Sequence, residues 1–363
     1  MTKKNILIAT GGTGGHVFPA YSLASYLIKN NYNVEISTDK RGYLFLKKYE
    51  DLKIIYLPSS PLKKGILNLL LSVVTIFYSM IRSFIFLLFN RPSIIFGMGG
   101  YSSFPLCVAA YILRIKFVIY ESNLIIGKAN KYLTPLTKKI FVSYKELEGI
   151  SKKYEDKVFR IGNIVREEII EFRTNDRKLD QSNSKKILVL GGSQGAKVFA
   201  ESLPEVFEKL KNSNFPIKIY QQCQKTQNIQ LSQFYKNKKI SHEIFNFTDN
   251  IIKYYSKVDL VITRSGASVL GELINIKVPF ILIPLPTSAD NHQYKNAQFY
   301  NNKGCGFLLN EKDIKNKLFD LITFIFKDKL TIKKILSNQS QFSDKNVFRN
   351  LENQLKEILN EKN

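Results

Sequence analysis

Cysteine and histidine are scarce in this chain of 363 residues, which holds three of each. Cys107, Cys223 and Cys305 stand far apart. They show neither the disulfide framework of a secreted domain nor the close spacing of metal ligands. The histidines are equally dispersed, so we do not expect a zinc site built by the protein.

Acidic residues are also few: 30 Asp and Glu stand against 54 Lys and Arg, a formal net charge of +24. Part of this excess reflects a composition rich in Lys, Asn and Ile. The rest favours polyanionic partners such as an anionic membrane, phosphorylated substrates or nucleic acid. A nucleic-acid-binding module would show a basic stripe with interleaved aromatics, whereas these lysines are scattered. We therefore expect no nucleic-acid partner.

The chain shows no secretory signal, because strand-like sequence begins at Asn5 without a basic region, apolar core and cleavage site before it. We expect the protein to stay on the cytoplasmic side of the membrane. A hydrophobic content of 44% is ample for a packed core. The length suits two domains of ordinary size.

Short apolar runs alternate with helical stretches along the chain. Most of these runs are continuous, as in parallel strands that helices cover on both faces. We expect strands at 6–9, 34–37, 54–57, 94–96, 117–120, 140–142 and 158–161, and later at 217–220, 244–247, 260–263, 280–284 and 307–309.

The opening of the chain is repeated half a chain later. KKILVLGGSQGAKVFAESL (185–203) has the layout of KKNILIATGGTGGHVFPAYSLA (3–24): lysines, a strand, a glycine-rich turn and a helix. Two such openings predict two doubly wound α/β domains with a crevice between them. We expect an N-terminal domain at 1–163, a linker at 164–184, a C-terminal domain at 185–345 and a last helix at 346–363 packing back on the junction.

Glycine-rich turns follow four of these strands: GGTGG (11–15), GMGGY (97–101), GGSQGA (191–196) and RSGA (264–267). Such a turn exposes backbone N–H groups at the start of the next helix, where an anion is favoured. Four turns at strand ends would surround one crevice with backbone donors. That arrangement suits a diphosphate with large groups on both sides.

Two familiar phosphate-binding motifs can be tested by spacing. Neither βα opening has the Gly-x4-Gly-Lys-[Ser/Thr] pattern of the ATP-binding P-loop. The dinucleotide pattern Gly-x-Gly-x-x-Gly fails as well, because Val17 occupies its third position after Gly12 and Gly14. Asp39, however, ends the second strand, where a ribose-binding acid would lie. A nicotinamide-dependent dehydrogenase therefore stays as an alternative.

These four turns, followed by Glu272 and DNHQYKNA (290–297), resemble the MurG family in order along nearly the whole chain. Its members are bacterial transferases that add N-acetylglucosamine to the lipid-linked muramyl-peptide precursor of peptidoglycan. The resemblance implies the α/β GT-B fold, with two Rossmann-like domains facing a cleft. It also implies inverting transfer from UDP-N-acetylglucosamine to an undecaprenyl-diphosphate-linked muramyl-pentapeptide, with no metal or other cofactor. A transferase acting on another lipid acceptor, such as diacylglycerol, is the runner-up.

The sequence itself also favours a reaction without a metal, because it has no Asp-x-Asp pair of the kind that holds a divalent ion on a sugar nucleotide. The charge on a departing UDP would then be held by helix N-termini, hydroxyls and a cation. By resemblance, Ser193 and Arg166 contact phosphate. Glu272 accepts hydrogen bonds from the ribose, Gln293 contacts the donor sugar, and Thr248 contacts uracil mainly through its backbone.

The segment YESNLIIGKANK (120–131) resembles the HEQN segment of the family. Asn123 is a candidate substrate contact there, and Glu121 is kept. Tyr120 and Ser122 depart from the family pattern. Ile164 replaces a usual proline in the turn GNIVR (162–166).

His16, beside the first glycine turn, is the candidate general base for the attacking sugar hydroxyl. A helix N-terminus disfavours imidazolium and so keeps the ring able to accept a proton. Its alternative roles are a hydrogen bond to phosphate and a structural cap. We assign Thr13, Gly14 and Gly15 to UDP-N-acetylglucosamine. The expected contacts of the acceptor diphosphate are Gly12, Gly99, Gly100 and Tyr101.

The most apolar segment is 61–92, whose uncharged run from Ile66 to Ile81 falls short of the ~20 residues that span a bilayer. We favour peripheral docking on an anionic membrane surface, where the headgroups would meet Lys63, Lys64, Arg82 and Arg91. The expected location is therefore the cytoplasmic side of the inner membrane. Two alternatives stay open: an embedded helix that continues through Arg82 to Phe89, and a crossover helix buried on the sheet.

Overall fold

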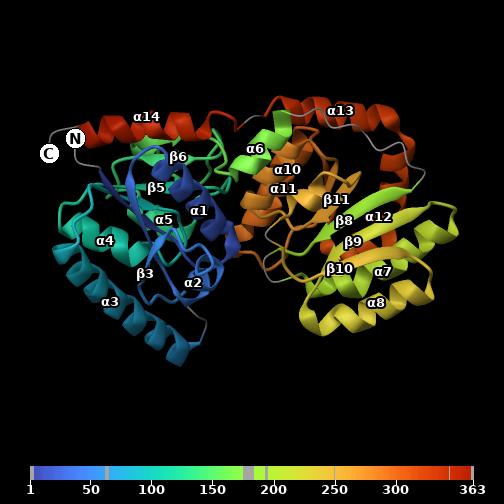
Figure 1. The fold of residues 1–363 in the computed structure, drawn as a ribbon, viewed down its shortest axis with the longest axis horizontal. Coiled ribbons are helices and arrows are strands. Elements are labelled where there is room, and N and C mark those ends of the chain that lie inside the picture. The colour runs from blue at the N-terminus through green and yellow to red at the C-terminus, as the bar shows by residue number, and fades with distance from the viewer. Residues whose placement is uncertain are drawn as a thin grey trace. The chain divides into compact units, whose positions relative to one another are not determined.

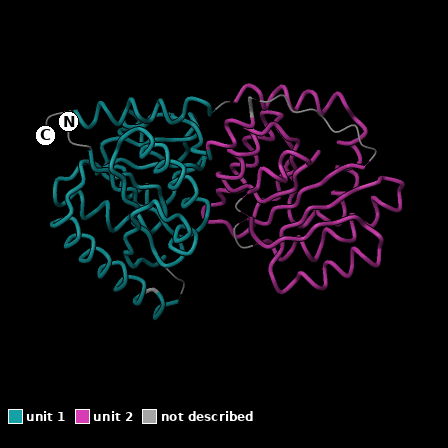
Figure 2. Tube along the Cα trace, in the orientation of Figure 1, with its two compact units in different colours: residues 1–166, 344–363 teal, residues 167–343 magenta. Residues whose placement is uncertain are grey.

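The computed structural model describes residues 4–61, 65–174, 184–192, 195–248, 250–342 and 344–360. The chain forms two compact units, Met1–Arg166 with Asp344–Asn363, and Glu167–Ser343 (Figure 2). The first unit is therefore built from two separate stretches of sequence, and the second unit is inserted between them.

The first unit contains a seven-stranded parallel sheet in the order β3-β2-β1-β4-β5-β6-β7 (Figure 1). Its strands are β1 (Asn5–Ala9), β2 (Asn33–Thr38), β3 (Lys53–Tyr56), β4 (Ile94–Gly97), β5 (Phe117–Glu121), β6 (Ile140–Val142) and β7 (Val158–Arg160). Its helices are α1 (Gly14–Lys29), α2 (Lys40–Leu46), α3 (Ile66–Phe89), α4 (Phe104–Ile112), α5 (Lys128–Leu133), the 3-10 helix η1 (Lys152–Lys157) and α14 (Val347–Asn360). The strand order changes direction between β1 and β4, which makes this pair the switch point of the sheet.

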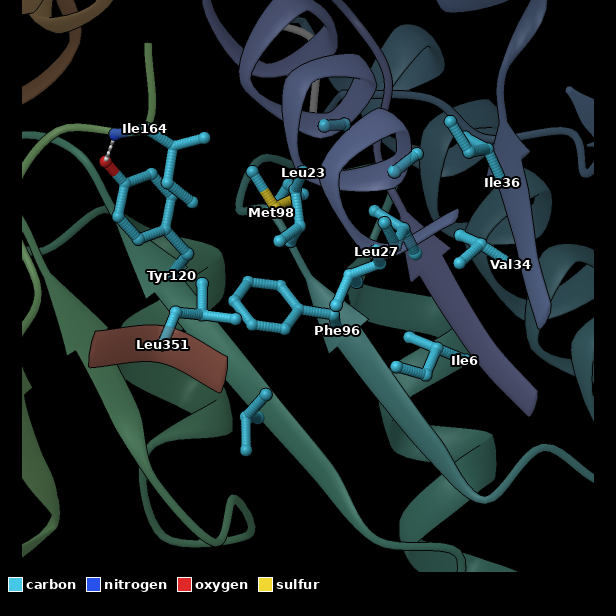
Figure 3. Packing of buried hydrophobic residues seen from close by; sticks show 14 of the residues in the cluster. Ile6, Leu23, Leu27, Val34, Ile36, Phe96, Met98, Tyr120, Ile164 and Leu351 are labelled. Carbon is cyan, nitrogen blue, oxygen red and sulfur yellow. Dashed lines mark hydrogen bonds between the residues drawn. The ribbon is translucent and has the colours of Figure 1, made fainter. Parts of the chain in front are cut away.

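Helices cover both faces of this sheet, which is why its strands are continuous apolar runs. Along β1, Ile6 and Ile8 pack in the core that contains α1 and α14. Leu7 points the other way, into the core that contains α3 and α4. Figure 3 shows Leu351 of α14 among the first of these groups, close to Phe96 of β4. The C-terminal helix is thus part of the hydrophobic core of the first unit.

The second unit contains a six-stranded parallel sheet in the order β10-β9-β8-β11-β12-β13. Its strands are β8 (Lys185–Leu190), β9 (Ile217–Gln222), β10 (Ser241–Phe245), β11 (Leu260–Thr263), β12 (Phe280–Leu282) and β13 (Phe307–Leu308). Its helices are α6 (Glu167–Thr174), α7 (Lys197–Asn212), α8 (Asn228–Asn237), α9 (Ile252–Tyr255), α10 (Ala267–Ile276), α11 (His292–Asn302), α12 (Ile314–Lys327) and α13 (Lys329–Ser340), with 3-10 helices η2 (Lys225–Gln227), η3 (Ala289–Asn291) and η4 (Glu311–Asp313). Its switch point lies between β8 and β11.

The predicted fold class is confirmed: each unit is a doubly wound parallel α/β unit, and every expected strand is present. The predicted linker at 164–184 is wrong in part, because residues 167–174 form α6, whose Ile169 is fully buried. The rest of that linker, 175–183, lies outside the described residues. The predicted boundaries also shift, to 166/167 and 343/344. The predicted last helix is α14, and it packs on the sheet of the first unit.

Candidate functional site

The four glycine-rich turns lie at the two switch points, two turns in each unit. In the first unit, Gly11–Gly15 follows β1 and Gly97–Tyr101 follows the neighbouring strand β4. In the second unit, the turn that begins at Gly191 follows β8, and Arg264–Ala267 follows the neighbouring strand β11. Carboxyl ends of parallel strands at a switch point are where open α/β sheets bind ligands. Each unit therefore has one sheet edge of the kind at which such folds bind ligands.

His16 is the third residue of α1, and its imidazole is held by the turn after β4. Its Nδ1 lies 3.0 Å from the carbonyl oxygen of Met98. A carbonyl can only accept a hydrogen bond, so Nδ1 carries the proton and Nε2 of the neutral ring has the lone pair. The structure thus sets the tautomer in which Nε2 can accept a proton.

Gly99 and Gly100 form the surface on which the His16 ring lies. A Cβ added at Gly100 would be 3.4 Å from both Nε2 and Cδ2 of His16, and one added at Gly99 would be 3.5 Å from Cε1. Both glycines have positive φ, +83° and +76°, which other residues rarely adopt. The expected acceptor-contacting glycines and the candidate base are therefore adjacent.

Thr13, Gly14 and Gly15 form the start of α1. Thr13 is the N-cap residue, with extended backbone and no side-chain cap bond, and the first turn contains no acidic residue. Because the first amides of a helix have no partner within the helix, this end suits an anion.

The backbone N–H of Gly12 and the hydroxyl of Tyr101, which were expected to contact the acceptor diphosphate, are bound within the protein. The buried Asp39 carboxylate takes the N–H of Gly12 at 3.0 Å, the N–H of Gly42 at 2.8 Å and the hydroxyl of Tyr101 at 2.7 Å. Burial, followed by this hydrogen bond, raises the pKa of Tyr101 to about 12, so the phenol keeps its proton. Asp39 therefore ties the two glycine turns together. The sequence placed Asp39 correctly at the end of β2 but gave no sign of this role.

This Asp39 contact also bears on the dehydrogenase alternative, because the carboxylate that would bind a ribose already accepts three protein donors. We expect Asp39→Asn to lower the free energy of unfolding by about 1–3 kcal/mol, since an amide nitrogen would face buried donors. Tyr101→Phe, which removes only one of the three bonds, should cost less. Chemical denaturation of the parent and the two variants measures their free energies of unfolding. An Asp39→Asn protein as stable as the parent would contradict the role assigned to Asp39.

Asn123 lies after β5 in a segment organised by Glu121. One oxygen of the Glu121 carboxylate accepts from the backbone and side-chain nitrogens of Asn123, at 3.0 and 2.9 Å. The other accepts from Gly127 N–H and Asn130 Nδ2, both at 2.9 Å. Glu121 therefore fixes the position and amide orientation of Asn123.

Glu272 lies on α10, beyond the turn after β11. It is 9% exposed, and the buried Tyr255 donates its hydroxyl to Oε2 at 3.0 Å. One carboxylate oxygen is thereby held by the protein, which fixes the group as an acceptor.

Gln293 is the second residue of α11. Its side-chain oxygen accepts the N–H of Leu285 at 3.0 Å, and its carbonyl accepts the Ser265 hydroxyl at 2.8 Å. The turn after β11 is therefore joined to the start of α11. In the preceding residue, Nδ1 of His292 donates to the carbonyl of Ala289 at 2.7 Å.

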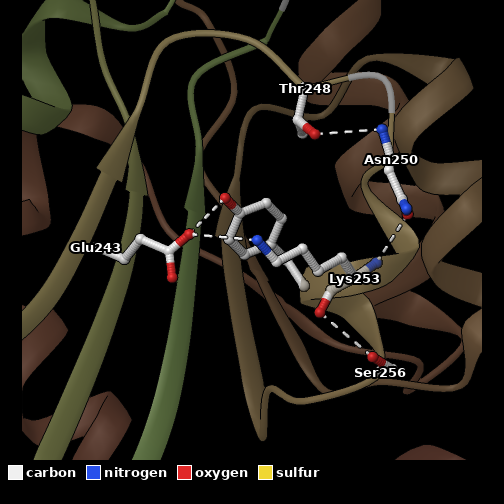
Figure 4. A network of polar contacts seen from close by, with 6 residues as sticks. Glu243, Thr248, Asn250, Lys253 and Ser256 are labelled. Atoms are coloured by element: carbon white, nitrogen blue, oxygen red, sulfur yellow. Dashed lines mark hydrogen bonds and ion pairs between the residues drawn. The ribbon is translucent and has the colours of Figure 1, made fainter.

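Thr248 lies after β10, in a turn shown in Figure 4. Its hydroxyl accepts the N–H of Asn250 at 3.2 Å, and the side-chain oxygen of Asn250 accepts the N–H of Lys253 at 3.2 Å. The Thr248 side chain is used within the turn. This arrangement is compatible with a ligand contact made by the backbone.

Two expected phosphate contacts are less fully placed. Ser193 lies outside the described residues, and the N–H of the flanking Gly191 donates to Gln222 Oε1 at 3.2 Å. Arg166 is half-buried and is the last residue of the first stretch of unit one. Among the described residues, no group of three His, Cys, Asp or Glu side chains could hold a metal ion.

By length and composition, helix α3, with 24 residues, is long and apolar enough to cross a membrane. Only 18% of its most apolar window is buried, so the interpretation as a buried crossover helix is wrong. We call its exposed apolar side chains, with two from α4, the α3 patch. The patch consists of Ile66, Leu67, Leu70, Leu71, Val73, Val74, Phe77, Tyr78, Ile81, Ile85, Leu88, Phe89, Tyr111 and Ile112.

Comparison with known proteins identifies relatives along the whole chain. The glycosyltransferase family 28 N-terminal domain matches residues 6–142, and the C-terminal domain of that family matches residues 186–361. A Pelagibacter ubique protein named UDP-N-acetylglucosamine–N-acetylmuramyl-(pentapeptide) pyrophosphoryl-undecaprenol N-acetylglucosamine transferase is 36% identical over 99% of each chain. A Rickettsia bellii protein of the same name is 37% identical over 88% of this chain and 91% of its own.

A solved structure shows the same fold. The crystal structure of Acinetobacter baumannii MurG superimposes with a TM-score of 0.76, covering 98% of this chain and 99% of the other at 22% identity. Together with the two domain matches and the curated relatives, this likeness confirms the resemblance that the motifs indicated. The chain belongs to the MurG family, within glycosyltransferase family 28.

Proposed function

We propose that this protein transfers N-acetylglucosamine from UDP-N-acetylglucosamine to an undecaprenyl-diphosphate-linked muramyl-pentapeptide, in peptidoglycan synthesis. The substrates are those in the names of the curated relatives. The observation that carries the proposal is the position of His16, whose Nδ1 donates to Met98 at 3.0 Å beside Gly99 and Gly100. We infer that Nε2 of this ring, on the side away from the hydrogen-bonded Nδ1, accepts the proton of the acceptor hydroxyl.

The proposed reaction is a single displacement. The acceptor sugar hydroxyl attacks the anomeric carbon of the donor, the bond from that carbon to the UDP oxygen breaks, and the anomeric centre inverts. The hydroxyl proton passes to His16 Nε2. The resulting imidazolium keeps its hydrogen bond from Nδ1 to Met98, so the ring need not turn during the step.

The donor is assigned mainly to the second unit. The Glu272 carboxylate would accept hydrogen bonds from the ribose hydroxyls, Gln293 would contact the sugar, and the backbone at Thr248 would contact uracil. Ser193, Arg166 and the helix start at Thr13–Gly15 would stabilise the negative charge that develops on the departing UDP, without a metal ion.

The acceptor diphosphate is assigned to the first unit, at Gly99 and Gly100. Gly12 and Tyr101 were expected to contact it directly. Because their donors go to Asp39, we now assign them to shaping the two turns.

A labelled-donor assay tests this function. The purified protein would be incubated with labelled UDP-N-acetylglucosamine and the lipid-linked muramyl-pentapeptide, and a labelled disaccharide lipid is the expected product. A parallel reaction with diacylglycerol tests the runner-up acceptor. Product formed only with diacylglycerol would overturn the proposed acceptor. Loss of transfer on adding a chelator would overturn the metal-free mechanism.

The α3 patch is proposed to dock peripherally on the anionic, cytoplasmic surface of the inner membrane. Its apolar side chains would enter the headgroup region, and the exposed Arg82, Arg91 and Arg114 would meet anionic lipid. Lys63 and Lys64, also expected there, lie outside the described residues. Such docking would bring the enzyme to an acceptor whose lipid chain lies in the bilayer.

Charge introduced into the α3 patch should weaken this docking. Val74 and Phe77, one helical turn apart and both 64% exposed, are suitable positions. We expect Val74→Glu with Phe77→Glu to lower binding to vesicles containing anionic lipid at least about tenfold, because two apolar side chains lose their burial in lipid. Vesicle co-sedimentation measures the change.

The matched control carries the same charges on exposed apolar residues of the second unit, Ile229 and Leu330. Ile229→Glu with Leu330→Glu should bind vesicles like the parent. Equal binding by the α3 variant would contradict docking through this patch. Release from membranes by detergent only, and not by high salt or carbonate, would instead indicate an embedded helix.

A further inference from the structure

Two residues of the first unit that lie 44 positions apart in the sequence, Tyr120 and Ile164, meet in its interior. The N–H of Ile164 donates to the hydroxyl oxygen of Tyr120 at 3.0 Å, a bond drawn in Figure 3. Proline has no N–H. The donor therefore exists because residue 164 is isoleucine, and the acceptor exists because residue 120 is tyrosine.

The Tyr120 hydroxyl has three partners and is buried, with 2% of the residue exposed. It lies 3.2 Å from the carbonyl oxygen of Gly162, which can only accept, so the phenol proton goes there. Ser143 Oγ, at 2.8 Å, and the Ile164 N–H then donate to the phenol oxygen. Burial raises the pKa of Tyr120 well above its usual range, so this proton is retained. One donor and two acceptor positions of a phenol are all used.

The bond from Tyr120 fixes a segment that leads directly to Arg166. On its other side, this segment is held by the buried Asp344. The Asp344 carboxylate accepts the backbone N–H of Asn163 at 2.9 Å and its side-chain Nδ2 at 3.2 Å. Residues 162–164 are thus held from β5 and from the start of the C-terminal stretch, and Arg166 follows two residues later.

We propose that Tyr120 and Ile164 are a matched pair and that Tyr120 is a positioning residue for Arg166 at the donor diphosphate. This rests on the proposed function, in which Arg166 contacts the phosphates of UDP-N-acetylglucosamine. Loss of the pair would displace the guanidinium without removing it. The KM for the donor and the Kd for UDP should then rise, and kcat should fall because the charge on the departing UDP loses part of its stabilisation.

A double-mutant cycle tests the pair. Tyr120→Phe and Ile164→Pro are each expected to raise the donor KM and the Kd for UDP about tenfold, since the first leaves the Ile164 N–H without its acceptor and the second removes that donor. The combined Tyr120→Phe/Ile164→Pro protein should be no worse than the poorer single variant, because both changes break one bond.

Tyr235→Phe is the control for loss of a buried phenol. Tyr235 lies in the second unit and donates to Gln221, so this change should lower thermal stability without altering the Kd for UDP. The proposal would be overturned if the effects of the two single changes on the Kd for UDP were additive in the double variant. It would also be overturned if Tyr120→Phe had the donor KM and the UDP affinity of the parent. If Ile164→Pro does not fold, Tyr120→Phe alone decides. A parent protein that binds no UDP would refute the proposed function instead.

Discussion

Replacing His16 with alanine is expected to lower turnover by about 10²–10⁴-fold when both substrates are saturating, because the attacking hydroxyl loses its proton acceptor. Saturation matters, since it separates a loss of chemistry from a loss of binding. UDP affinity should change little. Steady-state kinetics with both substrates varied, together with calorimetric titration of UDP, measures the two effects.

A matched variant separates the base from its rival roles. In His16→Asn, the side-chain amide can still donate to the Met98 carbonyl, but it has no basic nitrogen. If His16 is the base, asparagine should be nearly as inactive as alanine. A phosphate-binding role would instead raise the acceptor KM and leave kcat largely intact, and a cap would be seen in stability only. Full turnover by His16→Ala at saturation would exclude the base, and an acceptor KM equal to that of the parent would exclude the phosphate role as well.

Glu272→Ala is expected to raise the KM for UDP-N-acetylglucosamine and the Kd for UDP by about 10- to 100-fold, because a hydrogen bond to a charged group contributes about 1.5–3 kcal/mol. The turnover number should change less, since the ribose is remote from the bond that breaks. UDP carries the same ribose as the donor, so calorimetric titration of UDP is a direct measurement.

Two comparisons show whether the ribose is the group that Glu272 binds. The parent protein should prefer UDP to its 2′-deoxy analogue, and Glu272→Ala should lose that preference. Tyr255→Phe removes the hydroxyl that holds Glu272 Oε2 at 3.0 Å but leaves the carboxylate, so it should weaken UDP binding only a few-fold. UDP affinity unchanged in Glu272→Ala would contradict the assignment.

The strands and their turns could be predicted because their signals are local. A continuous apolar run such as Leu260–Thr263, closed by small residues, can be recognised without knowing its neighbours, and it is a strand with those bounds. β10 was expected at 244–247 but spans Ser241–Phe245. It is an edge strand whose residues are mostly half-buried, so its sequence carries a weaker apolar signal.

The contacts that shape the site could not be predicted, because they join distant residues. Asp39 is 27 residues from Gly12 and 62 from Tyr101, and only the sheet order brings their turns together. The bond from Ile164 to Tyr120 spans 44 residues. Helix α6 was hidden for another reason: its polar composition resembles a linker, and its place in the fold depends on the buried Ile169.

The return of the chain to its first unit has a consequence for biosynthesis. On the ribosome, the second unit emerges complete, whereas the first still lacks Leu351 and Leu355, which are fully buried in its core. Apolar side chains of the first sheet therefore stay exposed to solvent until translation ends. During this period they can bind chaperones or aggregate. A product that terminated prematurely before Asp344 would carry an intact second unit and an unfinished first one.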